Sequence, residues 1–304
     1  MFDFTGKVTL ITGASYGLGE EFAYSFADAG ADLILTARSE DLLMTVAEIC
    51  RGKGSKVTAV VGDVSDEADV LKVINAGMSD HGRIDLLINN AGIADPRGVV
   101  AEQFDTETFN RIISVDLTGA FLYARECGRH MLQRGTGAIV NICSILASGA
   151  NENSVAGYAA AKGGLRNLTL QLGVEWADRG VRVNSVSPGF VVTEMTGPML
   201  EAMGMDRWIA SRTPMRRVGK AQEVTNAVMF LASDMASYIT GVDLLVDGGT
   251  NASNGTYQMP PIHHEWNNET PQVRSSYEPV QPRPDWYQAL ERGIPGLHFP
   301  MSEE

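Results

Sequence analysis

The stretch Val8-Thr9-Leu10-Ile11-Thr12-Gly13-Ala14-Ser15-Tyr16-Gly17-Leu18-Gly19 decides the fold. It opens with an apolar, β-branched run that is typical of a buried parallel strand. It then passes through three glycines into a segment with helical spacing. Glycines at such a turn let backbone approach a phosphate, and the helix N-terminus presents free N–H groups to the anion. The stretch therefore predicts the first unit of a dinucleotide-binding fold, with a tight turn that binds no ligand as the alternative.

The same strand-and-helix alternation continues along the chain. It predicts an α/β fold with one Rossmann-type, doubly wound, parallel seven-stranded sheet covered by helices on both faces. Residues 1–249 form the expected catalytic domain, without a second core. The predicted strands are Val8–Thr12, Leu33–Ala37, Val57–Val61, Ile84–Asn89, Ala138–Ile142, Val181–Val186 and Val242–Val246. The predicted helices are Leu18–Ala29, Glu40–Arg51, Glu67–Asp80, Thr106–Gln133, Val155–Asp178 and Ala221–Ser233.

The composition changes after Gly249. Residues 250–304 hold eight of the twelve prolines of the chain, a density that blocks regular structure. They also carry aromatic residues, among them Trp266, Trp286 and Tyr287, which are unusual in a purely solvated segment. We expect this C-terminal extension to be an arm that packs on the domain or on a neighbouring subunit. A disordered tail is the alternative.

The charge balance excludes several classes of partner. The 304 residues include 24 Lys and Arg and 37 Asp and Glu, a formal net charge of −13. Nucleic-acid and anionic-membrane binding both favour a basic surface, so neither partner is expected. No apolar run approaches the length of a membrane span, and the N-terminus has no secretory signal pattern. Three widely spaced cysteines form neither a disulfide framework nor a zinc pattern, which predicts reduced thiols in the cytoplasm.

A second group of residues carries acid–base chemistry. Tyr158 and Lys162 are four residues apart on a predicted helix, so the phenol and the ammonium share one face. A lysine beside a phenol stabilises the phenolate. Ser144 follows a predicted strand, at the edge of the sheet where open α/β folds bind ligands. The alternatives are a chance pair on a helix surface and a serine that only caps a turn.

Together these residues resemble the short-chain dehydrogenase/reductase family, and the resemblance covers residues 5 to about 249. Five motifs in the family order carry it: Thr12–Gly19, Asn89-Asn90-Ala91-Gly92, Ser144 ahead of Tyr158-x-x-x-Lys162, Pro188-Gly189 with Thr193, and Val246-Asp247-Gly248-Gly249. The runs 141–144, 193–196 and 212–214 are similar to gluconate 5-dehydrogenase-type members, which points to a polyol or sugar-acid substrate.

The resemblance implies a role for each site residue. Tyr158 would be the catalytic acid/base, Lys162 would hold the nicotinamide ribose, and Ser144 would bind the reacting oxygen. Gly13, Gly17 and Gly19 would cover the pyrophosphate. The remaining cofactor contacts would come from Ser15, Tyr16, Leu18, Asp63 at the adenine, Val64, Asn90 at the adenosine ribose, Ala91, Gly92, Pro188, Gly189 and Thr193 at the carboxamide.

The sequence departs from the family pattern at a fourth catalytic position. The family has an asparagine there, which helps hold a water between the lysine and solvent, largely through its backbone carbonyl. This chain has Asp116, in Val115-Asp116-Leu117-Thr118-Gly119. The aspartate keeps the carbonyl and adds an acid. The gap from Ser144 to Tyr158 is also one residue longer than usual, with the insertion expected within 147–155.

The end of the second strand bears on the choice of cofactor. An acidic residue there would favour NAD by binding the ribose hydroxyls, but this chain has Ala37 followed by Arg38. A guanidinium suits a 2′-phosphate, so NADP(H) is favoured and NAD(H) is the alternative. Arg38 as a solvated charge or an adenine-stacking residue is the competing interpretation.

The expected activity is hydride transfer between a nicotinamide cofactor and a secondary alcohol or ketone. The alternatives are a lyase or epimerase on the same fold and a nucleotide-binding sensor without turnover. The expected partners are a small-molecule substrate and further copies of the chain, as a homodimer or homotetramer. No metal site is expected, because His263-His264-Glu265 lacks a third spaced ligand.

Overall fold

The computed structural model describes residues 2–95, 99–150, 155–192 and 205–253. Its core is a parallel sheet of seven strands, which confirms the predicted fold class. The strand order is β3 (Val57–Val61), β2 (Asp32–Ala37), β1 (Val8–Thr12), β4 (Leu86–Asn89), β5 (Gly137–Ile142), β6 (Val181–Pro188) and β9 (Asp243–Val246).

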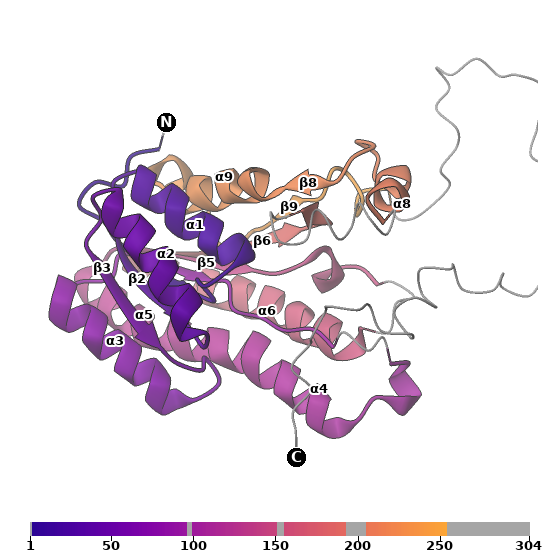
Figure 1. The fold of residues 1–304 in the computed structure, drawn as a ribbon, viewed down its shortest axis with the longest axis horizontal. Helices are drawn as coiled ribbons and strands as arrows, with labels where there is room; N and C mark the ends of the chain where they lie inside the picture. Colours follow the sequence, from indigo (N-terminus) through magenta and orange to yellow (C-terminus); the bar gives the residue numbers. More distant parts are fainter. Residues whose placement is uncertain (1, 96–98, 151–154, 193–204, 254–304) are drawn as a thin grey trace, which may run out of the picture.

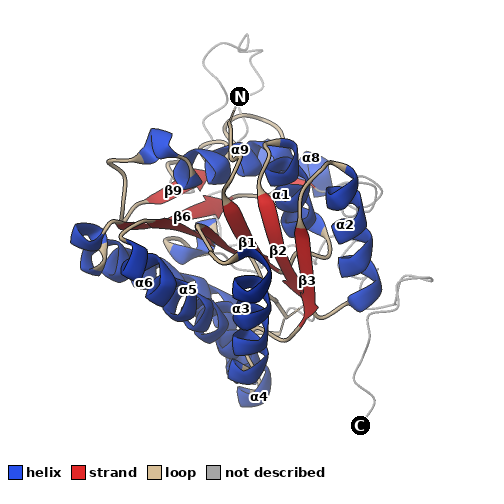
Figure 2. Cartoon of the chain, turned by 90° about the vertical axis from the view of Figure 1, so that its left-hand side faces the viewer, coloured by secondary structure: helices blue, strands red, loops and turns tan. Residues whose placement is uncertain are grey.

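Helices cover both faces of the sheet (Figures 1 and 2). One layer contains α1 (Gly17–Asp28), α2 (Glu40–Gly52) and α9 (Ala221–Ala232). The other contains α3 (Glu67–His81), α5 (Ala120–Arg134) and α6 (Ala156–Glu175), with α4 (Thr106–Ile113) packed beside α6.

The strand sequences explain the two layers, because successive side chains of a strand point to opposite faces of the sheet. Leu10 and Ile34 pack into the hydrophobic core beneath α3, α5 and α6. Their neighbours Ile11, Leu33 and Leu35 pack into the core beneath α1, α2 and α9. Both faces need apolar side chains, so the strands are apolar runs rather than alternating ones.

The predicted helix Thr106–Gln133 is divided in the structure. The chain forms α4, then a π-helical segment η2 (Ser114–Gly119), then α5. Wider turns of this kind are often found at functional sites. Gly119 ends the segment against the loop after β3, where a Cβ would lie 2.8 Å from the Val64 carbonyl oxygen. The wider turn carries Asp116, which is fully buried.

Several short elements have no counterpart in the predicted set. Residues 191–192 and 219–220 form a second, two-stranded parallel sheet, β7 (Val191–Val192) with β8 (Gly219–Lys220). An additional helix, α8 (Met205–Arg212), precedes β8. The predicted helix Val155–Asp178 ends earlier, at Glu175, and a 3-10 turn, η4 (Ala177–Arg179), follows it.

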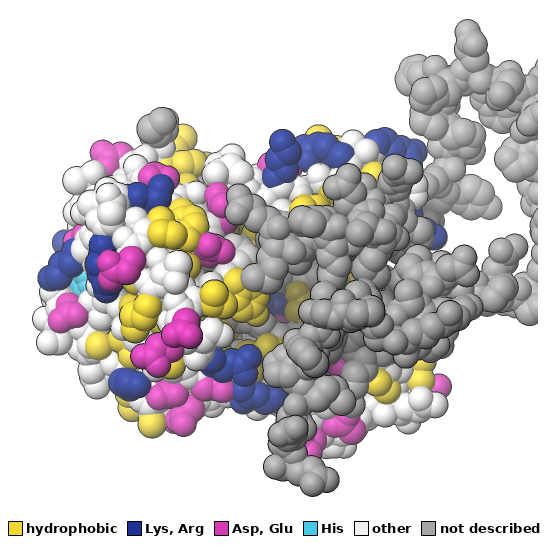
Figure 3. Space-filling view, viewed as in Figure 1, with side chains coloured by type: hydrophobic (Ala, Val, Ile, Leu, Met, Phe, Trp, Pro, Cys, Tyr) yellow, Lys and Arg dark blue, Asp and Glu magenta, His cyan; other side chains and the backbone are white. Residues whose placement is uncertain are grey.

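The described surface carries charges of both signs. Figure 3 shows acidic and basic side chains interspersed over most of the face it presents, with basic side chains gathered near β8. Arg212, Arg216, Arg217 and Lys220 are the exposed basic residues of that region. None of the described helices is both long enough and apolar enough to cross a membrane.

Candidate active site

The predicted cofactor residues gather at the carboxyl ends of β1 to β4. At this point β1 lies beside β4 and the direction of strand addition reverses, which is where open α/β sheets bind ligands. A cavity of about 260 Å³ opens there. Its lining contains Gly13, Ser15, Tyr16, Gly17, Leu18, Arg38, Asp63, Val64, Asn90, Ala91 and Gly92, together with Ala37, Ser39, Gly62, Ile93 and Val115.

The turn from β1 into α1 is suited to a phosphate. Gly13 and Gly17 adopt positive φ angles of 65° and 64°, which favour glycine. Gly19 lies behind the turn, where a Cβ would overlap the Gly13 carbonyl oxygen. The N-cap residue Tyr16 makes no side-chain hydrogen bond to the helix, so the first N–H groups of α1 have no side-chain cap. A pyrophosphate fits this turn, since it can accept from those N–H groups.

Asn90 holds the glycine turn in place. Its side-chain amide donates to the carbonyl oxygens of Thr12 (3.0 Å) and Gly13 (3.1 Å). The Thr12 hydroxyl in turn accepts from the backbone N–H groups of Asn90 and Ala91. Asn90 lines the cavity as predicted, but its amide is engaged within the protein, so contact with the adenosine ribose stays a prediction.

Asp63 also lines the cavity, and its carboxylate is engaged by other side chains. The Arg111 guanidinium donates to Asp63 Oδ2 at 2.6 Å and to the Ser65 hydroxyl at 2.7 Å. Partial burial disfavours the ionised carboxyl, but the hydrogen bonds from Arg111 and Ser65 outweigh it and lower the pKa of Asp63 to about 2. Sequence reasoning missed Arg111, because the ion pair joins residues 48 positions apart without a motif.

Arg38 follows β2 at the rim of the cavity. Its side chain is exposed and makes no ion pair with a described residue, whereas Ala37 beside it is buried. The guanidinium can therefore turn toward an anion at the adenosine end of the cavity.

Tyr158 and Lys162 lie on α6 with their side chains together. The Lys162 ammonium is 5.5 Å from the centre of the Tyr158 ring and is 3% exposed as a residue. It donates to the Ile142 carbonyl oxygen at 3.0 Å, at the end of β5. A Cβ on Gly92 would lie 3.1 Å from Lys162 Nζ, so the ammonium lies directly behind the cavity wall. The structure thus joins the predicted acid–base pair to the predicted cofactor cavity.

Ser144 stands immediately beyond β5 and is largely buried. Its hydroxyl oxygen accepts a hydrogen bond from the Leu146 N–H at 3.2 Å, which caps the short 3-10 helix η3 (Ile145–Ala147). The cap uses a lone pair of Ser144 and leaves the hydroxyl proton free to donate. The residue can therefore cap the turn and also donate to a substrate oxygen.

Asp116 reaches the same region from η2. Its Oδ2 is 3.2 Å from Lys162 Nζ, and its Oδ1 accepts from the Ile93 N–H at 2.7 Å. The predicted catalytic lysine is therefore flanked by a carboxylate. The contributions of the Ile93 N–H and the Ile142 carbonyl carry no sequence signal, because every residue has these backbone groups.

The end of β6 forms the far side of the site. Pro188 is the last residue of β6, and the Gly189 N–H donates to the Val246 carbonyl oxygen at 3.0 Å. Gly189 packs against Asp247, where a Cβ would lie 2.9 Å from the Asp247 Cα. Thr193 and the residues that follow it to 204 lie outside the described residues, as do His263, His264 and the arm from residue 254.

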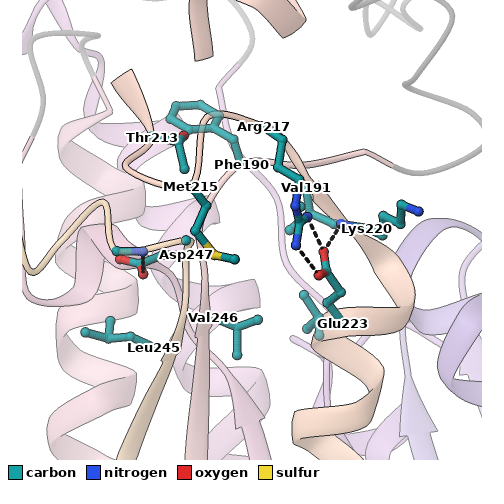
Figure 4. A pocket seen from close by; sticks show the side chains of 14 residues that line it. Phe190, Val191, Thr213, Met215, Arg217, Lys220, Glu223, Leu245, Val246 and Asp247 are labelled. Carbon is teal, nitrogen blue, oxygen red and sulfur yellow. Dashed lines mark hydrogen bonds and ion pairs between the residues drawn. The ribbon is translucent and has the colours of Figure 1, made fainter. Parts of the chain in front are cut away.

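A second cavity, of about 320 Å³, lies between β8, β9 and the start of α9 (Figure 4). Its acidic side chains are already paired. Glu223 forms an ion pair with Arg217, and Asp247 accepts from the N–H groups of Gly249 and Asn251. Its rim is apolar, with Phe190, Met215 and Leu245. It lacks the glycine turn and the acid–base pair, so the first cavity is the candidate active site.

Known proteins are similar to this chain in sequence. Residues 13–251 match the family model described as enoyl-(acyl carrier protein) reductase. The chain is 35% identical over 253 residues to gluconate 5-dehydrogenase of Gluconobacter oxydans, which covers 83% of this chain and 98% of that protein. It is 40% identical over 251 residues to galactitol 2-dehydrogenase (L-tagatose-forming) of Cereibacter sphaeroides, covering 82% and 96%.

Solved structures of other proteins are also similar to this chain. A gluconate 5-dehydrogenase from Burkholderia cenocepacia in complex with NADP and tartrate superposes with a TM-score of 0.77 at 35% identity, covering 83% of this chain and 97% of that chain. With its parallel seven-stranded sheet, its glycine turn and its Ser144, Tyr158 and Lys162, the chain belongs to the short-chain dehydrogenase/reductase family and is an oxidoreductase of CH–OH and C=O groups.

Proposed function

We propose that this protein is an NADP-dependent dehydrogenase that interconverts a secondary alcohol and a ketone of a polyol or sugar acid. The observation that carries the proposal is the placement of Tyr158 and Lys162 against the cofactor cavity, with the ammonium directly behind Gly92. A group that moves a proton at the substrate oxygen must lie beside the nicotinamide to be useful.

We assign a role to each residue of the site from its position. Bound nicotinamide supplies or accepts the hydride. The Tyr158 hydroxyl gives a proton to the ketone oxygen in reduction and takes it from the alcohol in oxidation. Ser144 donates a hydrogen bond to the same oxygen, where negative charge develops. Lys162 stabilises the phenolate of Tyr158 and donates to the nicotinamide ribose. The glycine turn holds the pyrophosphate, and Arg38 holds the 2′-phosphate.

Several relatives support the proposed substrate class. Gluconate 5-dehydrogenase and galactitol 2-dehydrogenase are named for a sugar acid and a polyol. A 2-dehydro-3-deoxy-D-gluconate 5-dehydrogenase of Formosa agariphila is 32% identical over 257 residues. Cis-4-hydroxycyclohexanecarboxylate dehydrogenase of Sinomonas cyclohexanicum, at 38% over 253 residues, also acts on a compound that carries both a hydroxyl and a carboxylate. Neither a lyase or epimerase nor a sensor without turnover has comparable support.

A direct assay tests the proposal. The purified full-length chain is mixed with NADP⁺ or NAD⁺ and a panel of gluconate, galactitol and simple secondary alcohols, and the absorbance of the reduced nicotinamide is followed. We expect turnover with NADP⁺ and with polyols or sugar acids. Binding of the cofactor without any change in absorbance for gluconate or galactitol would contradict the proposed substrate class.

Arg38→Ala tests the choice of cofactor. We expect NADP⁺ to bind more weakly by about 1.5–3 kcal/mol, the range for a hydrogen bond to a charged group, while NAD⁺ binding changes little. Arg51→Ala, at the other end of α2, is the matched control and should leave both affinities unchanged. The measurement is titration with each oxidised cofactor, followed by quenching of the protein fluorescence. Equal weakening of both cofactors would show that Arg38 contacts the adenine instead.

We propose that the chain assembles as a homodimer or homotetramer. Large apolar side chains are exposed on two neighbouring helices, Phe121 (39%) on α5 and Val174 (76%) on α6. Others surround the last strand, with Tyr238 and Met235 before β9 and Leu245 on it. Exposed apolar side chains that form a contiguous patch mark a surface that binds another protein, and we propose that these side chains form one.

We propose that the C-terminal arm borders the substrate site of its own or a neighbouring subunit. The described chain ends beside that site, because the Asn251 amide donates to the Ser148 hydroxyl at 2.8 Å, four residues beyond Ser144. Deletion of residues 254–304 should raise KM for the substrate or weaken assembly, with NADP⁺ affinity unchanged. Initial rates and light scattering measure these effects. Wild-type kinetics and assembly in the truncated protein would show that the arm is dispensable.

The proposed setting is the cytoplasm. All three cysteines are free and buried, as expected in a reducing compartment. Burial raises the pKa of the Cys50 thiol to about 11, which keeps it protonated and unreactive.

A further inference from the structure

A buried pair of opposite charges stands directly behind the wall of the cofactor cavity. Asp116 is fully buried and Lys162 is 3% exposed, and the two charged groups are 3.2 Å apart. A Cβ on Gly92 would lie 2.8 Å from Asp116 Oδ2 and 3.1 Å from Lys162 Nζ. Only a glycine therefore fits between the pair and the cavity.

The fold holds the Asp116 carboxylate at a fixed place. The π-helical segment η2 brings the side chain inward, and the Ile93 N–H donates to Oδ1 at 2.7 Å. The other oxygen, Oδ2, is buried without a hydrogen bond of good geometry and faces the Lys162 ammonium. One oxygen of Asp116 thus anchors the side chain to backbone, and the other presents negative charge to the lysine.

Among the described residues, the titratable groups that act on this ammonium are Tyr158 on α6, Asp116 on η2 and Cys143 at the end of β5. Two cations on neighbouring elements are paired with other carboxylates, Arg111 of α4 with Asp63 and Arg166 of α6 with Asp243 of β9. Within the described part of the chain, Asp116 is therefore the carboxylate that faces the lysine and, through it, the phenol.

The two groups stabilise each other as ions. Burial alone would lower the pKa of Lys162, but Tyr158 and Asp116 outweigh it and raise that pKa. Burial raises the pKa of the Asp116 carboxyl, while the Lys162 ammonium and the Ile93 N–H oppose this shift. We favour the doubly charged pair, because neutralising only one partner would leave an unbalanced charge in a buried site.

We propose that Asp116 is a positioning residue that anchors the Lys162 ammonium and partly cancels the field that this ammonium exerts on the Tyr158 hydroxyl. The proposal rests on the proposed function, in which Tyr158 is the acid/base. An asparagine of the same shape would still accept from the Ile93 N–H, but it would bring no negative charge. The carboxylate makes the phenolate less favourable than the lysine alone would make it.

Asp116→Asn tests this effect on the pH profile. Removing the negative charge favours the phenolate, so the proton acceptor for alcohol oxidation becomes available at lower pH. In the pH profile of kcat/KM for oxidation, we expect the acidic limb to move to lower pH by about one pH unit. This shift corresponds to about a tenfold change in the fraction of Tyr158 that is phenolate. The basic limb for ketone reduction, which needs the protonated phenol, should move in the same direction.

A matched variant controls for the loss of a buried carboxylate. Asp85 is also buried, pairs with Arg83 and Arg134, and accepts from the Val8 N–H at 2.9 Å. It precedes β4, at the end of the sheet opposite the active site. Asp85→Asn should lower thermal stability and leave both limbs in place. If Asp116→Asn does not fold, Asp116→Ala replaces it as the test variant. The limbs of its pH profiles should shift in the same direction.

A second readout separates this inference from the proposed function. The ultraviolet absorbance of tyrosinate is titrated in the cofactor-free protein, and the contribution that Tyr158→Phe removes is assigned to Tyr158. In Asp116→Asn this contribution should appear at lower pH, whether or not a substrate has been found. If the limbs of the pH profiles and the tyrosinate signal stay at their wild-type pH, or move to higher pH, the proposed role of Asp116 is wrong.

Discussion

Tyr158→Phe is expected to lower kcat by about 10²–10⁴ while the affinity for NADP⁺ stays nearly unchanged. The substitution removes only the hydroxyl and leaves the ring, which packs 5.5 Å from the Lys162 ammonium. A general acid/base contributes an effect of that size, and the remaining hydrogen bond from Ser144 cannot supply or accept the transferred proton. Steady-state rates in both directions, with cofactor titration by fluorescence, measure the two quantities.

Tyr24→Phe is the matched control for this prediction. Tyr24 is a partly buried tyrosine on α1 whose hydroxyl donates to Glu20 at 2.8 Å, outside the cofactor cavity. Its variant should keep wild-type kinetics. Activity of Tyr158→Phe within a factor of three of wild type would remove Tyr158 from the acid–base role.

The sheet was predictable because buried parallel strands leave a strong sequence signal. Most strands are apolar on both faces, so β1 and β3 have the expected bounds and the other five differ by one or two residues at one end. The two-residue strands β7 and β8 are too short for any such periodicity. The break between α4 and α5 was also missed, since the apolar spacing of the two helices runs on through η2.

Which residues form the site could be predicted from the sequence, but most of the contacts among them could not. Motif residues such as Gly13, Arg38 and Lys162 lie at the cavity because they follow strands or line one helix face. The hydrogen bonds of Asn90 and the ion pair of Asp63 join loops from different strands, and local sequence does not encode such pairings. The family resemblance placed Asp116 near the catalytic lysine, but the direct ion pair with Lys162 was not predicted, because the π-helical segment that carries Asp116 has no sequence signal.

Lys162→Ala is expected to damage three properties at once. Without the ammonium the phenolate of Tyr158 loses its nearest cation, so kcat should fall by up to the factor expected for Tyr158→Phe. NADP⁺ affinity should fall as well, because we propose that the same group donates to the nicotinamide ribose. Stability should fall by about 3–5 kcal/mol, since breaking a buried pair leaves the Asp116 carboxylate without its counter-ion. Rates, cofactor titration and denaturant unfolding measure the three effects.

The double variant Lys162→Ala with Asp116→Asn separates the structural effect from the catalytic one. Removing both charges leaves no unpaired ion, so most of the lost stability should return while the activity stays low. Lys72→Ala, an exposed lysine on α3 that donates to the Val61 carbonyl oxygen, is the control for loss of a lysine. If the double variant is as unstable as Lys162→Ala alone, the two groups do not act as a buried ion pair. If it regains activity together with stability, Lys162 acts only through the fold and its assigned catalytic role is wrong.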